Sequence, residues 1–233
     1  MDLIWQGFVD AVRLIVEGDG ELARIATLSL MVSISATLLA TLVGVPAGAA
    51  LALGRVDGRG LIQGIVNTGM GLPPVVVGLG VSILLWRSGP LGFLHLLYTP
   101  GAMILAQFIV AVPIAAGLTR VALDAVDREV LQALRADGAS ETVAGRELVL
   151  AALPQVMVAV AAAFGRAISE VGASLMVGGN LLGQTRILTT AISLETSKGE
   201  FARAIALGIV LLALAFMVNV ILALRTRLIR RVT

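Results

Sequence analysis

The chain has 233 residues, of which 58% are hydrophobic and only 14% charged, and its formal net charge is +2. It contains no cysteine, which excludes disulfides and thiolate metal sites, and its single histidine, His95, excludes a histidine metal cluster. The basic residues lie beside apolar stretches rather than in a patch of their own, which argues against a nucleic-acid-binding protein.

Long stretches without Asp, Glu, Lys or Arg are the strongest pattern in the chain. A helix needs about 20 mostly apolar residues to cross the hydrocarbon core of a bilayer, and each stretch can supply them. A soluble domain would need charged faces on its helices. We therefore expect an all-α, polytopic membrane protein, with residues 1–233 in a single transmembrane domain. About five transmembrane helices are expected, over residues 25–53, 61–86, 101–119, 148–168 and 204–224.

Residues 1–20 are expected to form an amphipathic helix that lies on the membrane surface. Ile4, Trp5, Phe8 and Val12 recur at helical spacing, with polar residues between them. Aromatic rings of this kind suit the interface between lipid and water. A frayed terminus is the alternative.

Two adjacent prolines, Pro73 and Pro74, interrupt the second expected span. Proline has no backbone N–H and breaks the local helix, which is tolerated in a membrane only where protein or water satisfies the freed carbonyls. A bend that lines a central pathway and a packing kink against a neighbouring helix both fit, and the glycines around the prolines, such as Gly78, allow either.

Residues 120–147 form a charged interruption between the third and fourth spans. We expect a helical piece over 121–136, a turn at Asp137–Gly138, and a second helix that starts near Ser140. A hydroxyl followed by the acidic Glu141 is typical of a helix start. A short helix with a charged face can dock on a soluble partner, although an ordinary solvated loop would have the same composition.

Arg166 and Glu170 stand out at the end of the fourth span, because ionisable groups within or at the edge of a span are costly and are functional candidates. Their spacing places them on one helix face, where they can pair. One interpretation is a structural ion pair. The other is that Arg166, with the hydroxyls of Ser169 and Ser174, contacts a passing dianion while Glu170 orients a gate.

Glycines, beginning with Gly172, make residues 171–185 a poor helix, so we expect a broken segment that returns towards the outer face. Asn180 could cap this segment or close the gate. Basic residues follow in the outer loops, and they either are solvated or meet acidic residues of a partner: Arg186, Lys198 and Arg203.

The distribution of arginine and lysine predicts the orientation of the spans. The loops that are richer in these residues should face the cytoplasm, which places the N-terminus outside and the C-terminus inside. The residues of the richer set are Arg55, Arg59, Arg120, Arg128, Arg135, Arg146, Arg225, Arg227, Arg230 and Arg231.

Three segments resemble type I ABC-transporter permeases of the molybdate, tungstate and sulfate branch. Residues 132–140, followed by Leu153–Pro154, are similar to the cytoplasmic signature loop of that family, although Gln132 stands where the family has Glu and the Leu-Pro pair arrives three residues late. Residues 71–78 and 165–180 are similar to the second span and to the segment after the signature loop. Shorter stretches look closer to the tungstate-type permease than to the molybdate type: 87–92, 106–107 and 186–196.

The resemblance implies the type I ABC permease fold and the permease subunit of a binding-protein-dependent importer of an oxyanion, with tungstate first and molybdate or sulfate as alternatives. It implies a homodimer in a prokaryotic plasma membrane, surrounded by lipid, with two ABC ATPase subunits on the cytoplasmic side and an oxyanion-binding protein outside. No cofactor is expected on this chain, because ATP and Mg would bind to the ATPase subunits.

The resemblance also gives two sets of candidate residues. Each ATPase would grip the signature loop, and the coupling residues expected there are Gln132, Ala133, Asp137, Gly138, Ala139, Ser140 and Glu141. The residues expected in the pathway or gate are Pro73, Pro74, Gly78, Arg166, Ser169, Glu170, Gly172, Ser174 and Asn180.

Two other classes of protein compete with the importer. A secondary transporter would need no ATPase, but inverted-repeat symmetry between the two halves, which would support it, is not visible in the sequence. A membrane-embedded enzyme would need catalytic residues or metal ligands, and no such constellation is present. The chain also has no GxxxxGKS or GxxxxGKT phosphate-binding loop, so an ABC transporter would need its ATPase on a separate chain.

Overall fold

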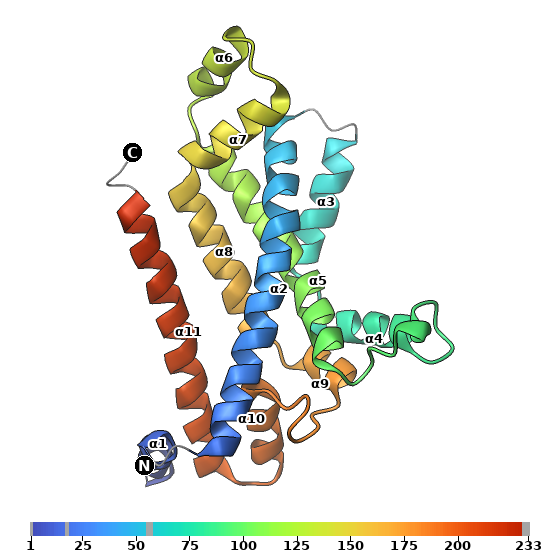
Figure 1. The fold of residues 1–233 in the computed structure, drawn as a ribbon, viewed down its shortest axis with the longest axis vertical. Helices are drawn as coiled ribbons and strands as arrows, with labels where there is room; N and C mark the ends of the chain where they lie inside the picture. The colour runs from blue at the N-terminus through green and yellow to red at the C-terminus, as the bar shows by residue number, and fades with distance from the viewer. Residues whose placement is uncertain (1, 17–18, 55–57, 230–233) are drawn as a thin grey trace.

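The computed structural model describes residues 2–16, 19–54 and 58–229, and within these ranges the chain is helical with no strand (Figure 1). Helices α2 (Gly20–Leu53), α5 (Pro100–Asp124) and α11 (Phe201–Ile229) are long and apolar enough to cross a membrane. Two bent helix pairs raise the candidate spans to as many as five, by length and composition. The all-α architecture with about five spans is therefore confirmed.

Helix α2 packs along α5 through small residues. Asp19 caps its start, because Oδ1 accepts hydrogen bonds from the backbone N–H groups of Glu21 and Leu22, and Gly54 caps its end with a φ of +76°. The two backbones approach most closely where α2 has glycine: a Cβ at Gly44 would lie 2.6 Å from the Cβ of Ala115 and 3.0 Å from the backbone nitrogen of Ala116. Such close approach suits helix packing in lipid, where small residues drive association.

The second expected span is broken into two helices. Helix α3 (Arg59–Met70) and helix α4 (Pro74–Leu85) meet at 104°, so the helix break predicted at Pro73 and Pro74 is confirmed. Pro73 lies at the break and is extended, with φ −63° and ψ 126°. Its extended backbone follows from its position before Pro74, because a residue that precedes a proline avoids the helical region.

The charged interruption also divides differently from the expectation. Helix α5 continues to Asp124, so a single helical piece over 121–136 is wrong. The chain turns at residues 125–127, where Asp127 caps helix α6 (Arg128–Ala136) by accepting a hydrogen bond of 3.0 Å from the N–H of Glu129. The extra start signal at Asp127 explains the division.

Helix α7 (Glu141–Ala151) and helix α8 (Leu153–Ile168) meet at 80°. The expected fourth span over 148–168 is therefore wrong at its beginning, because residues 148–151 belong to α7. Pro154 lies in the first turn of α8, where its missing N–H leaves no hydrogen bond unmade. It could not have continued α7, since a proline inside a helix removes a bond and clashes with the preceding turn.

The first helix lies at one end of the long helices. Helix α1 (Asp2–Val16) crosses the base of α11, and a Cβ at Gly7 would lie 2.5 Å from Ile205 (Figure 1). Trp5 and Phe8 are exposed and stack with ring centroids 5.9 Å apart. The predicted amphipathic helix is thus present within residues 2–16, while residues 1, 17 and 18 lie outside the described ranges.

The remaining elements connect the long helices, and one buried apolar cluster holds several of them together. The connecting elements are the 3-10 turn η1 (Gly92–Leu94), helix α9 (Gly172–Gly178) and helix α10 (Leu188–Ser197). The cluster joins α2, α4, α5 and α9 through Val32, Val81, Met103 and Val177. It fixes the short helices α4 and α9 on the surface that the two long helices provide.

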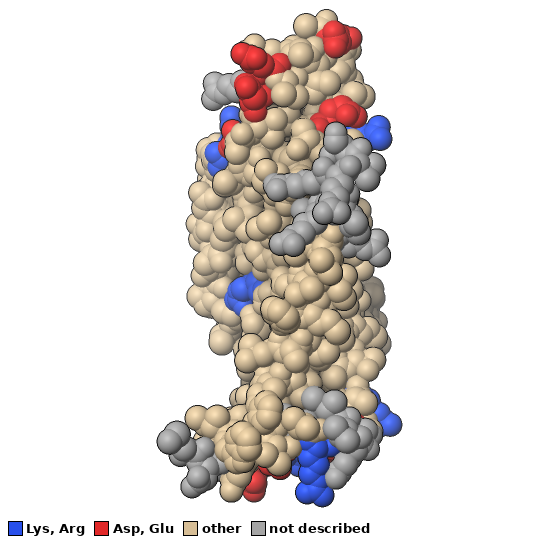
Figure 2. All heavy atoms as spheres, turned by 90° about the vertical axis from the view of Figure 1, so that its left-hand side faces the viewer, with Lys and Arg blue, Asp and Glu red and all other residues tan. Residues whose placement is uncertain are grey.

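On the face that Figure 2 shows, charged side chains gather towards the two ends, and the band between them is uncharged apart from one basic side chain. Helices α6 and α7 lie at one end, and α1 and α10 lie at the other (Figure 1). Which end faces the cytoplasm stays a prediction. Some of the arginines on which that prediction depends lie outside the described residues: Arg55, Arg230 and Arg231. Others belong to helices, but their side chains are not described: Arg128, Arg225 and Arg227.

Candidate functional site

Helices α6 and α7 form a two-helix projection beyond the ends of α2 and α5 (Figure 1). Its base is anchored, because Val126 and Leu131 pack on a buried cluster that includes Ala49, Leu123 and Leu148. This cluster contains residues of α2, α5, α7 and α8. The base of the projection is therefore packed directly on these four helices.

The turn between the two helices is built by local chemistry. Gly138 has a φ of +81°, a conformation that side chains disfavour, and Ser140 caps α7 by accepting a hydrogen bond of 3.4 Å from the N–H of Val143. Arg135 donates from Nε and Nη2 to the carboxylate of Glu141, at 3.3 and 3.4 Å. The helix start predicted near Ser140 is confirmed.

The expected coupling residues all lie on this projection. Gln132 and Ala133 are exposed on α6, and Asp137, Gly138 and Ser140 are exposed around the turn. Ala139 and Glu141 are half-buried. The arrangement offers a compact protruding surface, supported at its base and free at its tip, which is suited to insertion into a groove of another protein.

A cavity of about 590 Å³ lies beneath α6, between the ends of α2 and α5. Charged side chains of both signs line it, among them Arg59, Arg120 and Arg135, with Asp124 and Asp127. Arg120 and Asp124 form an ion pair of 3.1 Å. The projection is therefore packed against the core along one side only, and a polar space separates its other side from the helix ends.

Glu170 fixes the corner between α8 and α9. Its side chain is 1% exposed; Oε2 accepts a hydrogen bond of 2.8 Å from Nη1 of Arg166, and Oε1 accepts one of 2.9 Å from the N–H of Ala173. Its backbone carbonyl accepts a hydrogen bond of 2.9 Å from Oγ1 of Thr189, at the start of α10. The predicted pairing of Arg166 with Glu170 is present in the structure.

The two hydroxyls named with this pair are placed differently. Ser169 is exposed and donates a hydrogen bond to the carbonyl of Arg166. Ser174 is fully buried and accepts a hydrogen bond of 3.2 Å from Nε2 of Gln107, while Oε1 of Gln107 has no hydrogen-bond partner among the described residues. Gln107 did not enter the candidate list, because a lone amide in an apolar run carries no positional signal until the fold places Ser174 beside it.

Helices α4 and α9 cross at two glycines. A Cβ at Gly78 would lie 2.8 Å from the Cα of Ala173, and a Cβ at Gly172 would lie 3.0 Å from Cγ2 of Val75. Pro73 and Pro74 precede this crossing, and Pro73 is exposed. The predicted gate residues on these two elements thus come together, and the glycines among them serve close packing.

The loop between α9 and α10 is held by Asn180 and its partners. Asn180 has a φ of +52°, and its Nδ2 donates to the carbonyl of Thr190 at 3.4 Å. Arg186 donates from Nε to Oδ1 of Asn180 at 3.3 Å and from Nη2 to its carbonyl at 3.4 Å. Asn180 therefore orients the guanidinium of Arg186, a partnership that the sequence did not suggest.

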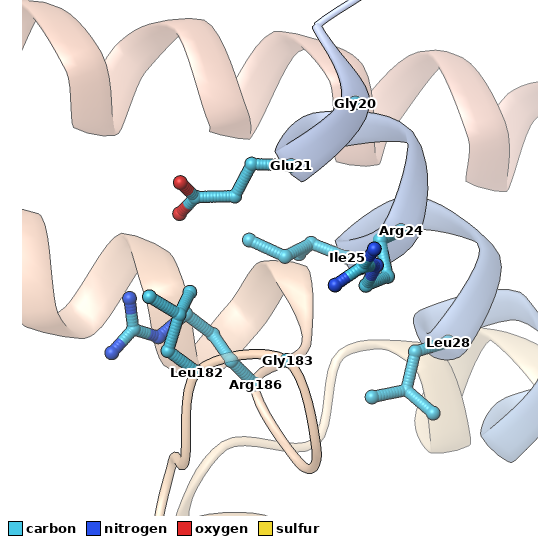
Figure 3. Close-up of a pocket in the computed structure, with 8 residues that line it drawn as sticks. All are labelled: Gly20, Glu21, Arg24, Ile25, Leu28, Leu182, Gly183 and Arg186. Atoms are coloured by element: carbon cyan, nitrogen blue, oxygen red, sulfur yellow. The ribbon is translucent and has the colours of Figure 1, made fainter.

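A pocket of about 260 Å³ lies beside this loop, and Figure 3 shows the side chains that line it. The start of α2 and the start of α10, which border the pocket, lie towards the end of the molecule opposite α6 (Figure 1). Glu21 and Arg24 reach it from the first turns of α2, and Arg186 reaches it from the loop before α10. Arg24 was not among the candidates, because its position at the edge of a charge-free run is also that of an ordinary interfacial arginine.

The sequence and the fold match known proteins over nearly the whole chain. The family described as "Binding-protein-dependent transport system inner membrane component" matches residues 40–231. A probable anion ABC transporter permease protein of Haloferax volcanii is 42% identical, with 85% of this chain and 88% of that protein covered. The tungstate uptake system permease protein TupB of Peptoclostridium acidaminophilum is 38% identical, with 95% and 97% covered.

A solved structure shares the fold. A chain in an inward-facing structure of the MetNI methionine ABC transporter superposes with a TM-score of 0.72, covering 91% of this chain and 96% of that one. The two sequences are 21% identical, so this likeness concerns the fold alone. It agrees with the type I ABC permease fold that the sequence predicts.

Proposed function

The chain belongs to the family of binding-protein-dependent transport system inner membrane components, and we propose that it is the permease subunit of an ABC importer for tungstate. The choice of tungstate as the substrate rests on the match to a tungstate uptake permease, which extends over 95% of this chain and 97% of the relative. A match of this length includes the projection, the α4–α9 crossing and the outer loops together. The proposed location is a prokaryotic plasma membrane.

The proposed assembly is a homodimer with a pathway between the two copies. Asn67 and Thr68 are exposed on α3, directly before the break at Pro73. Polar side chains and broken backbone do not face lipid, because their hydrogen bonds would be unmet there. A second copy across a water-filled pathway supplies the environment that this surface needs.

Two ATPase subunits bind ATP and Mg and grip the α6–α7 projections from the cytoplasm in this proposal. Closure of the ATPase dimer then moves the projections, and their anchored bases pass the motion to α2, α5 and α8 as a rigid-body switch between two packed states. Gln132 to Glu141 are the coupling residues, and a binding protein delivers the oxyanion at the opposite end.

The gate in this proposal is the pair of short helices α4 and α9. The glycine contacts at Gly78 and Gly172 make the two helices move together, and Glu170 ties them to α8 and α10. Glu170 is a positioning residue, because its carboxylate is buried and both of its oxygens are engaged. Arg166, which is partly exposed, and the exposed Ser169 are the groups of this corner that can meet a passing dianion.

The test is ATP-dependent uptake in proteoliposomes that contain this chain, its ATPase and its binding protein. Tungstate, molybdate and sulfate are compared from sub-micromolar to higher concentrations. Selective uptake of tungstate at the lowest concentration supports the proposal. Equal uptake of molybdate or sulfate removes the substrate assignment and keeps the importer, whereas uptake without the ATPase removes the importer and favours a secondary transporter.

A further inference from the structure

A fully buried amide lies at the contact between α5 and α9. Gln107 of α5 is 0% exposed, and its Nε2 donates a hydrogen bond of 3.2 Å to Oγ of Ser174 on α9, which is also 0% exposed. In the part of the chain that the structure describes, this is the one side-chain hydrogen bond that joins the two helices.

The surroundings of this hydrogen bond are apolar and tightly packed. Ala106 of α5 and Val177 of α9 belong to one buried apolar cluster. One helical turn from the amide, a Cβ at Gly178 would lie 2.8 Å from Sδ of Met103, so the two helices approach closely there. A polar group enclosed in this way depends on protein partners for its hydrogen bonds.

The amide of Gln107 is only half satisfied by these surroundings. Its Oε1 has no hydrogen-bond partner among the described residues. Whichever way the amide is turned, the hydroxyl of Ser174 engages only one of its two polar ends. A buried polar group without a hydrogen bond costs free energy that the same group does not cost in water. The contact between α5 and α9 is therefore less stable than an apolar side chain at position 107 would make it.

Helix α9 connects this contact to the proposed gate. Its start is fixed by Oε1 of Glu170, which accepts the hydrogen bond of the N–H of Ala173, and it crosses α4 at Gly78. Its end is tied to the residues before α5, because the N–H of Tyr98 donates a 2.8 Å hydrogen bond to the carbonyl of Val177. Since α5 is itself packed along α2, a movement of α4 and α9 against the long helices must open the contact at Gln107.

We propose that Gln107 is a positioning residue of the transport cycle: it holds α9 on α5 in the arrangement seen here, and its unmet hydrogen-bonding capacity lets the two helices part when the gate opens. Once they part, both ends of the amide can bind water, which relieves the cost of burial. An apolar side chain would instead become exposed to water on opening. The inference rests on the proposed function, because it takes α4 and α9 as the gate.

The experiment replaces the amide by an apolar side chain of similar length, in Gln107→Met. Thermal unfolding and ATP-dependent tungstate uptake are measured on the same complete transporter. The variant should melt at the wild-type temperature or above, while uptake falls about tenfold, because the packed arrangement is favoured. A merely structural amide would lose stability and uptake together. A lower melting temperature, or uptake equal to wild type, would overturn the proposal.

Thr119→Val is the matched control on the same helix. Thr119 is 0% exposed, and its Oγ1 also has no hydrogen-bond partner among the described residues. It packs against α2 and not α9, since a Cβ at Gly48 would lie 2.9 Å from the Cβ of Thr119. Its melting temperature should hold or rise, and uptake should equal wild type. A loss of uptake as large as in Gln107→Met would refute the role of the α5–α9 contact.

A second measurement tests directly whether the two helices part. The chain has no cysteine, so Met103→Cys combined with Gly178→Cys introduces one pair, and a Cβ at Gly178 would lie 3.0 Å from Cγ of Met103, close enough for a disulfide. Oxidation should abolish uptake and reduction should restore it, with wild type taken through the same treatment as the control. Normal uptake by the disulfide-linked protein would overturn the proposal.

Wild-type uptake in these assays separates this inference from the proposed function. If wild type takes up tungstate with ATP and the variants behave against expectation, only the role of Gln107 is lost. If wild type shows no ATP-dependent uptake, the proposed function fails and this inference fails with it.

Discussion

Nη1 of Arg166 donates a 2.8 Å hydrogen bond to Oε2 of Glu170, and only the arginine reaches the surface: its side chain is 26% exposed, against 1% for the glutamate. The pair is therefore asymmetric. Loss of the arginine strands a buried carboxylate, whereas loss of the glutamate charge leaves an arginine that can still reach solvent. The two residues thus have unequal effects on stability although they form one ion pair.

This asymmetry gives a first prediction. Arg166→Leu should destabilise the subunit by about 3 kcal/mol, because it breaks a buried pair and leaves Glu170 with the N–H of Ala173 as its remaining side-chain partner. Glu170→Gln should cost less, since the amide oxygen can still accept that hydrogen bond. Thermal unfolding of the purified subunits measures both, and the double variant should recover part of the loss in Arg166→Leu. Equal losses in the two single variants would show that the carboxylate is not stranded.

The α4–α9 crossing gives a second prediction. Gly78→Ala should destabilise the subunit by about 1–3 kcal/mol, because its Cβ would lie 2.8 Å from the Cα of Ala173 and the backbone must shift. Gly80→Ala is the control on the same helix, since nothing lies within 4 Å of its Cβ position. The control should be neutral or more stable, because alanine favours a helix over glycine. Similar melting temperatures for both variants would contradict the close crossing.

Gly138 gives a third prediction, for the turn at the tip of the projection. Gly138→Val should weaken ATPase association and uptake, because a β-branched residue at a φ of +81° is strained and the turn must rearrange. Gly138→Asn should retain most of both, since asparagine tolerates this conformation. Co-purification of the ATPase, with membrane content as a loading control, measures the effect. Normal association of the valine variant would remove the turn from the coupling surface.

Ser140 gives a fourth prediction, for the start of α7. Ser140→Ala should destabilise this helix by about 1 kcal/mol, because it removes the hydrogen bond accepted from Val143. Thr142→Ala is the neighbouring control, since Thr142 is exposed and does not cap the helix. Hydrogen exchange in α7, measured by mass spectrometry, should rise in the first variant alone. A comparable rise in the control would show that exposure of the tip, and not the cap, sets local stability.

Much of the architecture can be read from the sequence because charge-free runs and helix signals act locally. The three long helices contain the expected spans 25–53, 101–119 and 204–224, and the start near Ser140 and the interruption at Pro73 occur where expected. Angles between helices are not local. The 104° and 80° bends depend on which surfaces the short helices find, and proline marks a break without giving its direction.

The same distinction between local patterns and long-range contacts applies to the candidate site. The pairing of Arg166 with Glu170 follows from helical spacing, which one segment contains entirely. The contact of Ser174 with Gln107 and the pocket that both Arg24 and Arg186 line bring together residues far apart in the chain. No pattern within either segment encodes such contacts, so these residues can be recognised as candidates only once the fold is known.

The division of the second span into α3 and α4 also has a consequence for biogenesis. Each helix has 12 residues and is about 18 Å long, which is well short of the roughly 30 Å hydrocarbon core. Neither half can partition stably into lipid by itself, and the polar backbone at the break needs a protein surface. For α3 that surface is α5, and for α4 it is α9 together with α5; the ribosome makes both α5 and α9 afterwards. We therefore expect the growing chain to keep α3 and α4 at the insertion machinery until α5 and α9 have emerged.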